Sequence, residues 1–283
     1  MDNENPRKYD FFLKGGNGRA VLLIHGITGT PSEMRYLGKS LNEAGFSVLC
    51  STLPRHCASL GELRRVRWQE IADACAGDLE GLKREHSEVY AGGLSMGALL
   101  AIHLAYKYPS VVSGIIALAP TLIYDGWAVP KTKVLMDILW HVPFIRNRFD
   151  IRESWPYGLK NENLRAGVER FYTNAAAASL DDKAAIFGSP FFPMSCLYQH
   201  HLFAKVVKRE LAGIRTPILI IHARDDDMTS PGNARYIYDR IASPDKSLVI
   251  LDDSYHMITI DKQKDKVAGE MIRFIQRSKL NGI

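Results

Sequence analysis

The chain contains several short runs of apolar residues that do not alternate with polar ones. Residues 20–24 form the clearest run, which is typical of a strand covered on both faces. Strands are also expected at the apolar-rich residues 46–53, 111–118 and 217–221. Between them, apolar positions recur with helical spacing, as over residues 61–86, where we expect one long amphipathic helix. Strands that alternate with helices in this way predict an α/β fold with a mostly parallel central sheet and helices on both faces.

This alternation stops between residues 121 and 215. The segment lacks a further buried-strand run, is rich in aromatic residues and has helical stretches, the last of them around 198–211. We interpret residues 121–215 as an inserted helical cap, or lid, and residues 1–120 and 216–283 as the core that it covers. Open α/β sheets bind ligands beyond the carboxyl ends of their strands, so the cap is expected to lie there.

Most aromatic side chains of this cap are expected to form its own hydrophobic core. The others are expected to line an apolar substrate pocket, and Trp127, Met136 and Trp140 are the first candidates for that lining. An aromatic lining of this kind favours an apolar acyl group as the ligand.

Composition and charge argue against several classes of protein. The 283 residues carry a net charge of only +5, and no block of Lys and Arg is long enough to indicate a nucleic-acid partner. No run of about 18 apolar residues occurs, so we expect no stable membrane insertion, and the N-terminus lacks the apolar core of a signal peptide. The four cysteines have no spacing typical of a metal site and are expected to be reduced thiols of a cytoplasmic protein.

A candidate nucleophile lies where one apolar run passes directly into a helical pattern. Residues 88–100 read EVYAGGLSMGALL, which contains Gly-x-Ser-x-Gly with Ser95 at its centre. A strand that turns this sharply into a helix brings backbone segments close together, so glycine is needed at Gly93 and Gly97, and the serine projects above the sheet. Met96 is then the first helical residue, with a free N–H for a developing oxyanion. The same pattern also occurs by chance in loops, so it needs partners elsewhere in the chain.

The segment after the first long strand supplies one such partner. Residues 25–31 read HGITGTP, and a glycine-rich loop after a buried strand lets a backbone N–H approach a reacting carbonyl oxygen. The amide of Ile27 is the best placed donor, with that of Met96 as the second. His25 is interpreted as a side chain that braces the loop by hydrogen bonding. Taken alone, the loop is also compatible with a simple glycine turn.

Acidic residues and a histidine follow the last two predicted strands. Asp225, Asp226 and Asp227 come directly after one of these strands, and His256 follows the other. The carboxyl ends of parallel strands meet at one edge of a sheet, so these side chains can converge on Ser95. A serine hydroxyl needs a base to take its proton, and a carboxylate on the other imidazole nitrogen fixes the tautomer of that base. The order Ser, Asp, His therefore predicts a catalytic triad.

With these motifs, the chain resembles the α/β-hydrolase family over nearly its whole length, and within it the compact bacterial carboxylesterases and monoacylglycerol lipases. The resemblance is carried by VLLIHGITGTP, GGLSMG, IIHARDDDMTSP and DDSYHMITID at residues 21–31, 92–97, 221–231 and 252–261. It implies that Asp226 is the acid, with Asp225 and Asp227 as alternatives that are expected instead to face solvent or cap the following helix. It also places Ile27 and Met96 at the oxyanion hole and implies that neither a metal nor an organic cofactor is needed.

One loop departs from the pattern of these esterases. They usually carry Leu-Pro-Gly-His-Gly after the second core strand, whereas here Arg55 and Cys57 stand at the two glycine positions of residues 53–57. Without glycine, the backbone is not expected to take the same conformation. Arg55 is interpreted as an exposed side chain, with attraction of a carboxylate-bearing substrate as the alternative.

The motifs and the resemblance together predict a serine hydrolase that cleaves carboxylic esters of short to medium acyl chain, monoacylglycerol-like esters among them, through an acyl-enzyme on Ser95. A thioesterase, a lactonase, a carbon–carbon bond hydrolase or a cofactor-free haloperoxidase would use the same residues, because one fold hosts many reactions. A binding protein on this scaffold would be expected to lack a triad member, and none is missing. The expected partner is a small-molecule ester, and the oligomeric state is left open.

Overall fold

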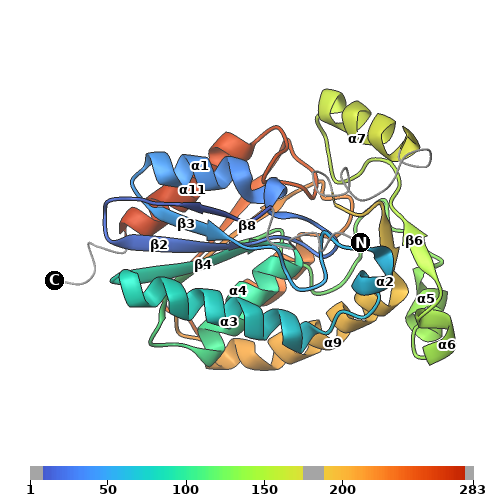
Figure 1. Ribbon diagram of the computed structural model, residues 1–283, viewed down its shortest axis with the longest axis horizontal. Helices are drawn as coiled ribbons and strands as arrows, with labels where there is room; N and C mark the ends of the chain where they lie inside the picture. Colours follow the sequence, from blue (N-terminus) through green and yellow to red (C-terminus); the bar gives the residue numbers. More distant parts are fainter. Residues whose placement is uncertain (1–8, 175–187, 278–283) are drawn as a thin grey trace, which may run out of the picture.

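The computed structural model describes residues 9–174 and 188–277, and a seven-stranded sheet forms its centre (Figure 1). The strands follow the order β1-β3-β2-β4-β5-β8-β9, and all neighbours are parallel except β1 and β3. Their bounds are β1 Phe11–Leu13, β2 Arg19–Ile24, β3 Ser47–Cys50, β4 Glu88–Leu94, β5 Val112–Leu118, β8 Ile218–Ala223 and β9 Lys246–Leu251. The mostly parallel sheet confirms the predicted fold class.

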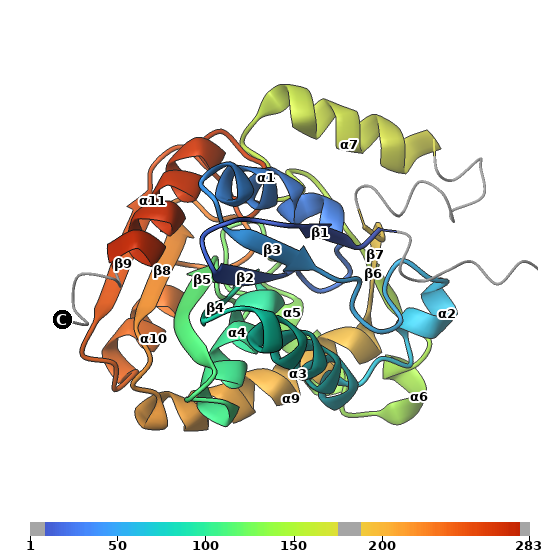
Figure 2. The ribbon, with the colours of Figure 1, turned by 60° about the vertical axis from the view of Figure 1, so that its left-hand side comes forward.

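Helices cover both faces of this sheet (Figure 2). One face is covered by α1 (Arg35–Glu43) and α11 (Lys264–Arg277), and the other by α3 (Trp68–Glu85), α4 (Met96–Lys107), α9 (Met194–Glu210) and α10 (Gly232–Arg240). Along β2, Ala20, Leu22 and Ile24 pack on the side of α3 and α4, while Val21 and Leu23 pack on the side of α1 and α11. Burial on both faces explains why this strand is apolar at successive positions.

The single helix predicted over residues 61–86 is wrong, because the structure divides it. A short helix, α2 (Leu60–Leu63), is followed by a break before α3 begins. Distant side chains satisfy backbone groups at the break: the Ser195 hydroxyl donates to the Arg64 carbonyl (2.9 Å), and Gln199 accepts the N–H of Trp68 (3.4 Å). Contacts between segments this far apart in sequence are not visible in the spacing of apolar residues.

The segment between β5 and β8 contains strands as well as the expected helices. Its described residues form α5 (Lys133–Leu139), α6 (Pro143–Arg146), β6 (Asp150–Arg152), α7 (Glu162–Asn174), β7 (Phe191–Pro193), α9 and a 3-10 helix, η2 (Leu211–Gly213), with β6 and β7 paired antiparallel. In Figure 1, α5, α6 and α7 lie to the right of the sheet. By contrast, α9, which was expected in the cap, packs against α3 and α4 and extends the helical layer on that face.

The division of the chain into a core and a cap at residues 121 and 215 stays a prediction. Parts of it, residues 1–8, 175–187 and 278–283, lie outside the described residues. Within the described ranges, no helix combines the length and the apolar composition needed to cross a bilayer.

The junction of β4 and α4 is packed tightly against the end of β2. A Cβ atom on Gly97 would lie 2.1 Å from the carbonyl oxygen of Ile24, and one on Gly93 would lie 2.4 Å from the backbone of Gly97. Distances this short leave no room for a side chain, so close approach requires both glycines. The junction thereby fixes where β4 ends relative to β2.

Replacing Gly97 with Ala is expected to destabilise the fold by about 3 kcal/mol, because the added methyl group forces the β2 backbone to move. Gly77→Ala is the matched control, since Gly77 lies on the exposed side of α3 with nothing within 4 Å of its added Cβ. That control should stabilise the protein by about 1 kcal/mol through higher helix propensity. Urea unfolding followed by circular dichroism measures both, and equal stability of the two variants would contradict the packing argument.

Candidate active site

Ser95 lies between β4 and α4 in a strained backbone conformation. Its φ of 58° and ψ of −110° fall outside the regions that residues other than glycine normally occupy. The N–H of Ser95 donates to the Leu118 carbonyl at the end of β5 (2.8 Å), and α4 begins at the next residue, Met96. The turn therefore holds the serine side chain at the carboxyl edge of the sheet, where the residue is 4% exposed.

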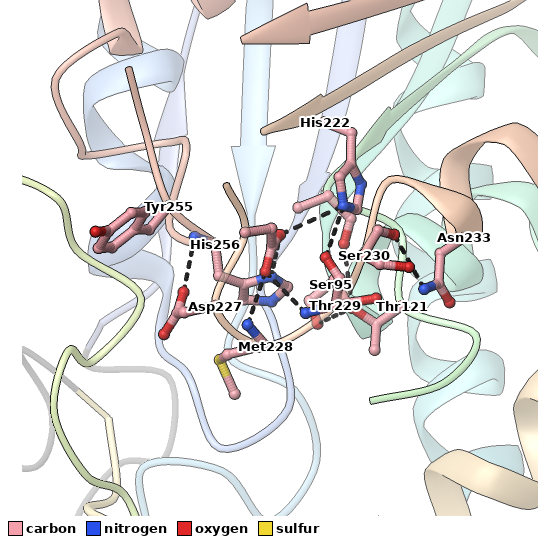
Figure 3. A network of polar contacts seen from close by, with 12 residues as sticks. Ser95, Thr121, His222, Asp227, Met228, Thr229, Ser230, Asn233, Tyr255 and His256 are labelled. Atoms are coloured by element: carbon pink, nitrogen blue, oxygen red, sulfur yellow. Dashed lines mark hydrogen bonds and ion pairs between the residues drawn. The ribbon is translucent and has the colours of Figure 1, made fainter. Parts of the chain in front are cut away.

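The Ser95 hydroxyl is hydrogen-bonded to Thr121, a residue that the sequence analysis did not single out. The two side-chain oxygens are 3.0 Å apart, and Thr121 Oγ1 also donates to the Ala119 carbonyl (3.2 Å). Because the threonine proton is used in this second bond, the serine hydroxyl is the donor in the first. Figure 3 shows Ser95, Thr121 and His256 together at the sheet edge. Thr121 closely follows β5 as Ser95 follows β4, and this position after a neighbouring strand is the signal that could have identified it.

Asp226 and His256 meet at the ends of β8 and β9. The Nδ1–H of His256 donates to Asp226 Oδ2 (2.8 Å), and Asp226 Oδ1 accepts from the N–H groups of Met228 (2.9 Å) and Thr229 (2.8 Å). Burial alone would raise the pKa of Asp226, but the charge and hydrogen bond of His256, together with His222 and the Thr229 N–H, outweigh it and lower that pKa. The structure thus brings the acid implied by the family resemblance onto the histidine ring.

His256 is buried in the wall of the same cavity as Ser95. Burial lowers the pKa of its imidazole, but the carboxylates of Asp226, Asp227 and Glu33 together outweigh this effect and leave the pKa above its ordinary value of 6.5. Since Asp226 holds Nδ1, the Nε2 atom is left to take a proton from Ser95. The serine hydroxyl is turned toward Thr121 in the structure, so this transfer requires a rotation about the serine side-chain bond.

Asp227 is buried, which corrects the expectation that it faces solvent or caps a helix. It is 2% exposed and accepts the N–H groups of His256 (3.2 Å) and Gly158 (3.1 Å). Burial raises its pKa to about 6. Asp225, by contrast, lies at the surface, where it pairs with Lys160 (3.2 Å). Asp227 therefore connects the loop of His256 to the segment between β6 and α7.

The loop after β2 is braced by His25, as expected. The Nδ1–H of this ring donates to the Gly26 carbonyl (3.0 Å), and its Nε2 accepts the N–H of Leu53 (3.1 Å). Burial lowers the pKa of His25 to about 3, so the ring stays neutral, as this pair of bonds requires. Ile27 lies in the wall of the cavity that holds Ser95. The role of the Ile27 and Met96 amides as oxyanion donors stays a prediction.

A cavity of about 330 Å³ lies between the strand ends and the segment that follows β5. Ser95, His256 and Ile27 form its core side. The other side is mostly apolar and aromatic and includes Tyr157, Leu159, Leu164, Val168, Tyr172 and Phe192. A second cavity of about 200 Å³ shares part of this wall, including Glu153.

Two of the three pocket candidates line a cavity. Met136 and Trp140 lie in the wall of the second cavity. Trp127 lines neither of these two cavities and is 52% exposed, so nothing here supports its place in the pocket lining. Its indole N–H donates to the Asp225 carbonyl (2.9 Å), and its ring lies edge-on to Tyr255. These contacts hold the indole at the surface.

Arg55 and Cys57 take the left-handed conformation that glycine favours, which corrects the expectation for residues 53–57. Their φ angles are 64° and 55°, and a side chain in this region costs roughly 1–2 kcal/mol per residue. Arg55 lines neither cavity and pairs with Glu62 (2.7 Å) and Glu70 (3.0 Å). The partners of this guanidinium group are therefore carboxylates of the protein itself.

Replacing Asp227 with Asn is expected to lower the pKa of His256, because it removes a buried negative charge next to the imidazole. Asp225→Asn is the matched control, since it removes a surface charge that pairs with Lys160, and it should leave the pKa of His256 unchanged. NMR titration of the His256 ring measures both effects. A pKa that responds equally to the two substitutions would contradict the assignment of Asp227 to the site.

Comparison with known proteins places this chain in a family. The model of the family described as serine aminopeptidase, S33, matches residues 16–263. A carboxylesterase of Bacillus subtilis (strain 168) is 26% identical over 272 residues, which cover 94% of this chain and 96% of that protein. A thermostable monoacylglycerol lipase of Bacillus sp. (strain H-257) is 26% identical over 257 residues, 91% of this chain and 90% of that protein.

A solved structure of a metagenome-derived lipolytic enzyme has a TM-score of 0.79 to this one at 23% identity, covering 96% of this chain and 98% of that one. Similarity at this level of identity shows a shared fold, here the α/β-hydrolase fold. The family match extends over both halves of the sheet and the segment between them. The chain therefore belongs to the hydrolase family described as serine aminopeptidase, S33.

Proposed function

We propose that this protein is a serine hydrolase that cleaves carboxylic esters of short to medium acyl chain through an acyl-enzyme on Ser95. The observation that carries the proposal is the position of His256, held by Asp226, in the wall of the cavity that also contains Ser95. A buried acid–histidine pair beside a serine on a strand-to-helix turn is the arrangement that activates a hydroxyl group. The two Bacillus relatives, a carboxylesterase and a monoacylglycerol lipase, support an ester as the substrate.

The reaction starts when the Ser95 hydroxyl turns from Thr121 to Nε2 of His256, which takes the proton as the serine oxygen attacks the ester carbonyl. The backbone N–H groups of Ile27 and Met96 stabilise the oxyanion that forms. Collapse of this tetrahedral intermediate breaks the ester C–O bond, and His256 gives its proton to the leaving alcohol. Water, deprotonated by His256, then attacks the acyl-enzyme carbonyl. The second tetrahedral intermediate breaks its bond to Ser95 Oγ and releases the carboxylic acid, and His256 returns the proton to the serine oxygen.

The size and lining of the cavity support a small, largely apolar ester. A volume of about 330 Å³ is at the lower end of the usual range for small-molecule sites, which fits an acyl chain of short to medium length. Monoacylglycerol-like esters belong to this class, and no metal or organic cofactor enters the proposed steps. The cytoplasmic location expected from the sequence stays a prediction.

The alternative substrates are thioesters, lactones and compounds with an activated carbon–carbon bond. In each of them the same residues would attack the carbonyl carbon next to the bond that breaks. A panel of p-nitrophenyl esters of increasing acyl length, acyl thioesters and lactones separates the possibilities. Turnover of thioesters or lactones without turnover of open-chain esters would contradict the proposed substrate class. It would leave the proposed role of Ser95 as nucleophile unchanged.

Ser95→Ala is expected to abolish ester turnover and to leave thermal unfolding nearly unchanged, because it removes the nucleophile and a single hydrogen bond. Intact-mass spectrometry after treatment with a fluorophosphonate should show one adduct on the wild type and none on the variant. Ester hydrolysis that persists in Ser95→Ala would exclude an acyl-enzyme at this residue.

The kcat/KM for an ester is expected to rise with pH through an ionisation above 6.5, since only neutral His256 accepts the serine proton and its pKa is raised. The kcat/KM rises with pH because a raised pKa keeps the imidazole charged, and the enzyme inactive, to higher pH. A pH–rate profile measures this acid limb. An acid limb below the ordinary pKa of histidine would show that the carboxylates around His256 do not act as described.

A further inference from the structure

The loop that carries Ile27 is folded around the side chain of Glu33. Glu33 Oε1 accepts the N–H of Gly26 at 2.5 Å. At the other end of the turn, a Cβ atom on Gly29 would lie 2.4 Å from Glu33 Oε2, so the carboxyl group lies directly against the Gly29 backbone. One carboxyl group therefore contacts both ends of the turn formed by residues 26–29.

Hydrogen bonds hold the peptide group between Gly26 and Ile27 and also the peptide group before it. Its carbonyl accepts from His25 Nδ1 (3.0 Å) and from the N–H of Gly29 (3.2 Å). The preceding N–H, that of Gly26, is held by Glu33. Because a trans peptide group is planar, the direction of the carbonyl also fixes the direction of the Ile27 N–H. Glu33 thus holds the peptide group directly before the amide that is expected to stabilise the oxyanion.

The turn is strained and needs contacts from outside to keep its shape. Thr28 has a φ of 61°, which is unfavourable for a β-branched residue. The N–H of Ser189 donates to the Thr28 carbonyl (3.0 Å). Glu33 contributes the contact on the side of the reacting groups, because it lies in the cavity wall together with Ser95 and His256.

The Glu33 carboxyl group contributes little else to the fold. Burial raises its pKa to about 7, and the groups that oppose this effect are the N–H groups of Gly26 and Thr30 and the ring of His256. No Lys or Arg of the described residues is among them. A partly buried carboxyl group that no Lys or Arg pairs with is unfavourable for stability, so a role in the reaction is a better explanation of its position than a role in folding.

We propose that Glu33 is a positioning residue for ester hydrolysis, and that it holds the turn at residues 26–29 so that the Ile27 N–H meets the oxyanion. This inference rests on the proposed function, since it gives Glu33 a part in that reaction. A residue with this role lowers the energy of the transition state and leaves substrate binding nearly unchanged.

Glu33→Ala is expected to lower kcat for a p-nitrophenyl ester about 30-fold to 100-fold and to change KM less than about threefold, because the oxyanion exists only in the transition state. Glu33→Gln keeps an oxygen that accepts the Gly26 N–H and should stay within about fivefold of wild-type kcat. A trifluoromethyl ketone, which forms a tetrahedral adduct on Ser95, should bind Glu33→Ala more weakly by the same factor as the loss of kcat/KM. Glu80→Ala removes an exposed carboxylate on α3 and serves as the control.

A double-mutant cycle keeps the test decisive if Glu33→Ala proves hard to fold. A methyl group on Gly29 would displace the Glu33 carboxyl group, so Gly29→Ala alone should also lower kcat. In the Glu33→Ala or Glu33→Gln background, the same change should cost less than it does in the wild type, because the two residues act through one contact. Independent effects of the two substitutions would overturn the inference.

Two further outcomes separate this inference from the proposed function. A wild-type protein that labels with a fluorophosphonate and turns over esters, together with a Glu33→Ala variant of equal kcat, would overturn the inference alone. A raised KM at unchanged kcat in Glu33→Ala would also overturn it, because Glu33 would then bind substrate. A wild-type protein without ester turnover would overturn the proposed function, and the inference with it.

Discussion

The close approach of the β4–α4 junction to the end of β2 is the constraint on which the site depends. The Ile24 carbonyl oxygen occupies the space that a side chain at Gly97 would need. Because β2 continues directly into the loop that carries Ile27, the contact that demands glycine also brings this loop beside Ser95. The strained backbone of the serine persists because the sheet on one side and α4 on the other determine it. The geometry of the site is thus a result of how two neighbouring parallel strands end.

The carboxyl groups around His256 show that position, more than residue type, decides what an acidic side chain does. Asp226 and Asp227 are adjacent in sequence, yet one binds the imidazole ring and the other binds the backbone N–H of the same histidine. The first fixes the tautomer and the second fixes the loop, and both charges favour the protonated ring. Glu33 lies near the same ring but holds a different element, the turn before η1 (Pro31–Met34).

Sequence reasoning succeeded where local geometry dictates the residue type. A sharp strand-to-helix turn demands glycine around Ser95, and parallel strands of an α/β sheet demand apolar runs, so the fold class was predictable. The choice of Asp226 over its neighbours came from a family resemblance. Contacts between distant segments were not predictable: the bond from Ser95 to Thr121, the burial of Asp227 and the surface position of Trp127 each depend on partners far away in the chain. The break between α2 and α3 has the same origin.

The two bonds to Asp227 link access to the cavity with the state of the base. One carboxylate joins Gly158, between β6 and α7, to the backbone of His256, and the N–H of Met257 donates to the Gly158 carbonyl (2.9 Å). A displacement of the segment at Gly158 would therefore also displace the loop that positions the His256 imidazole. The cavity wall at Gly158 and the position of the base therefore depend on the same set of contacts, so a substitution that loosens one also loosens the other.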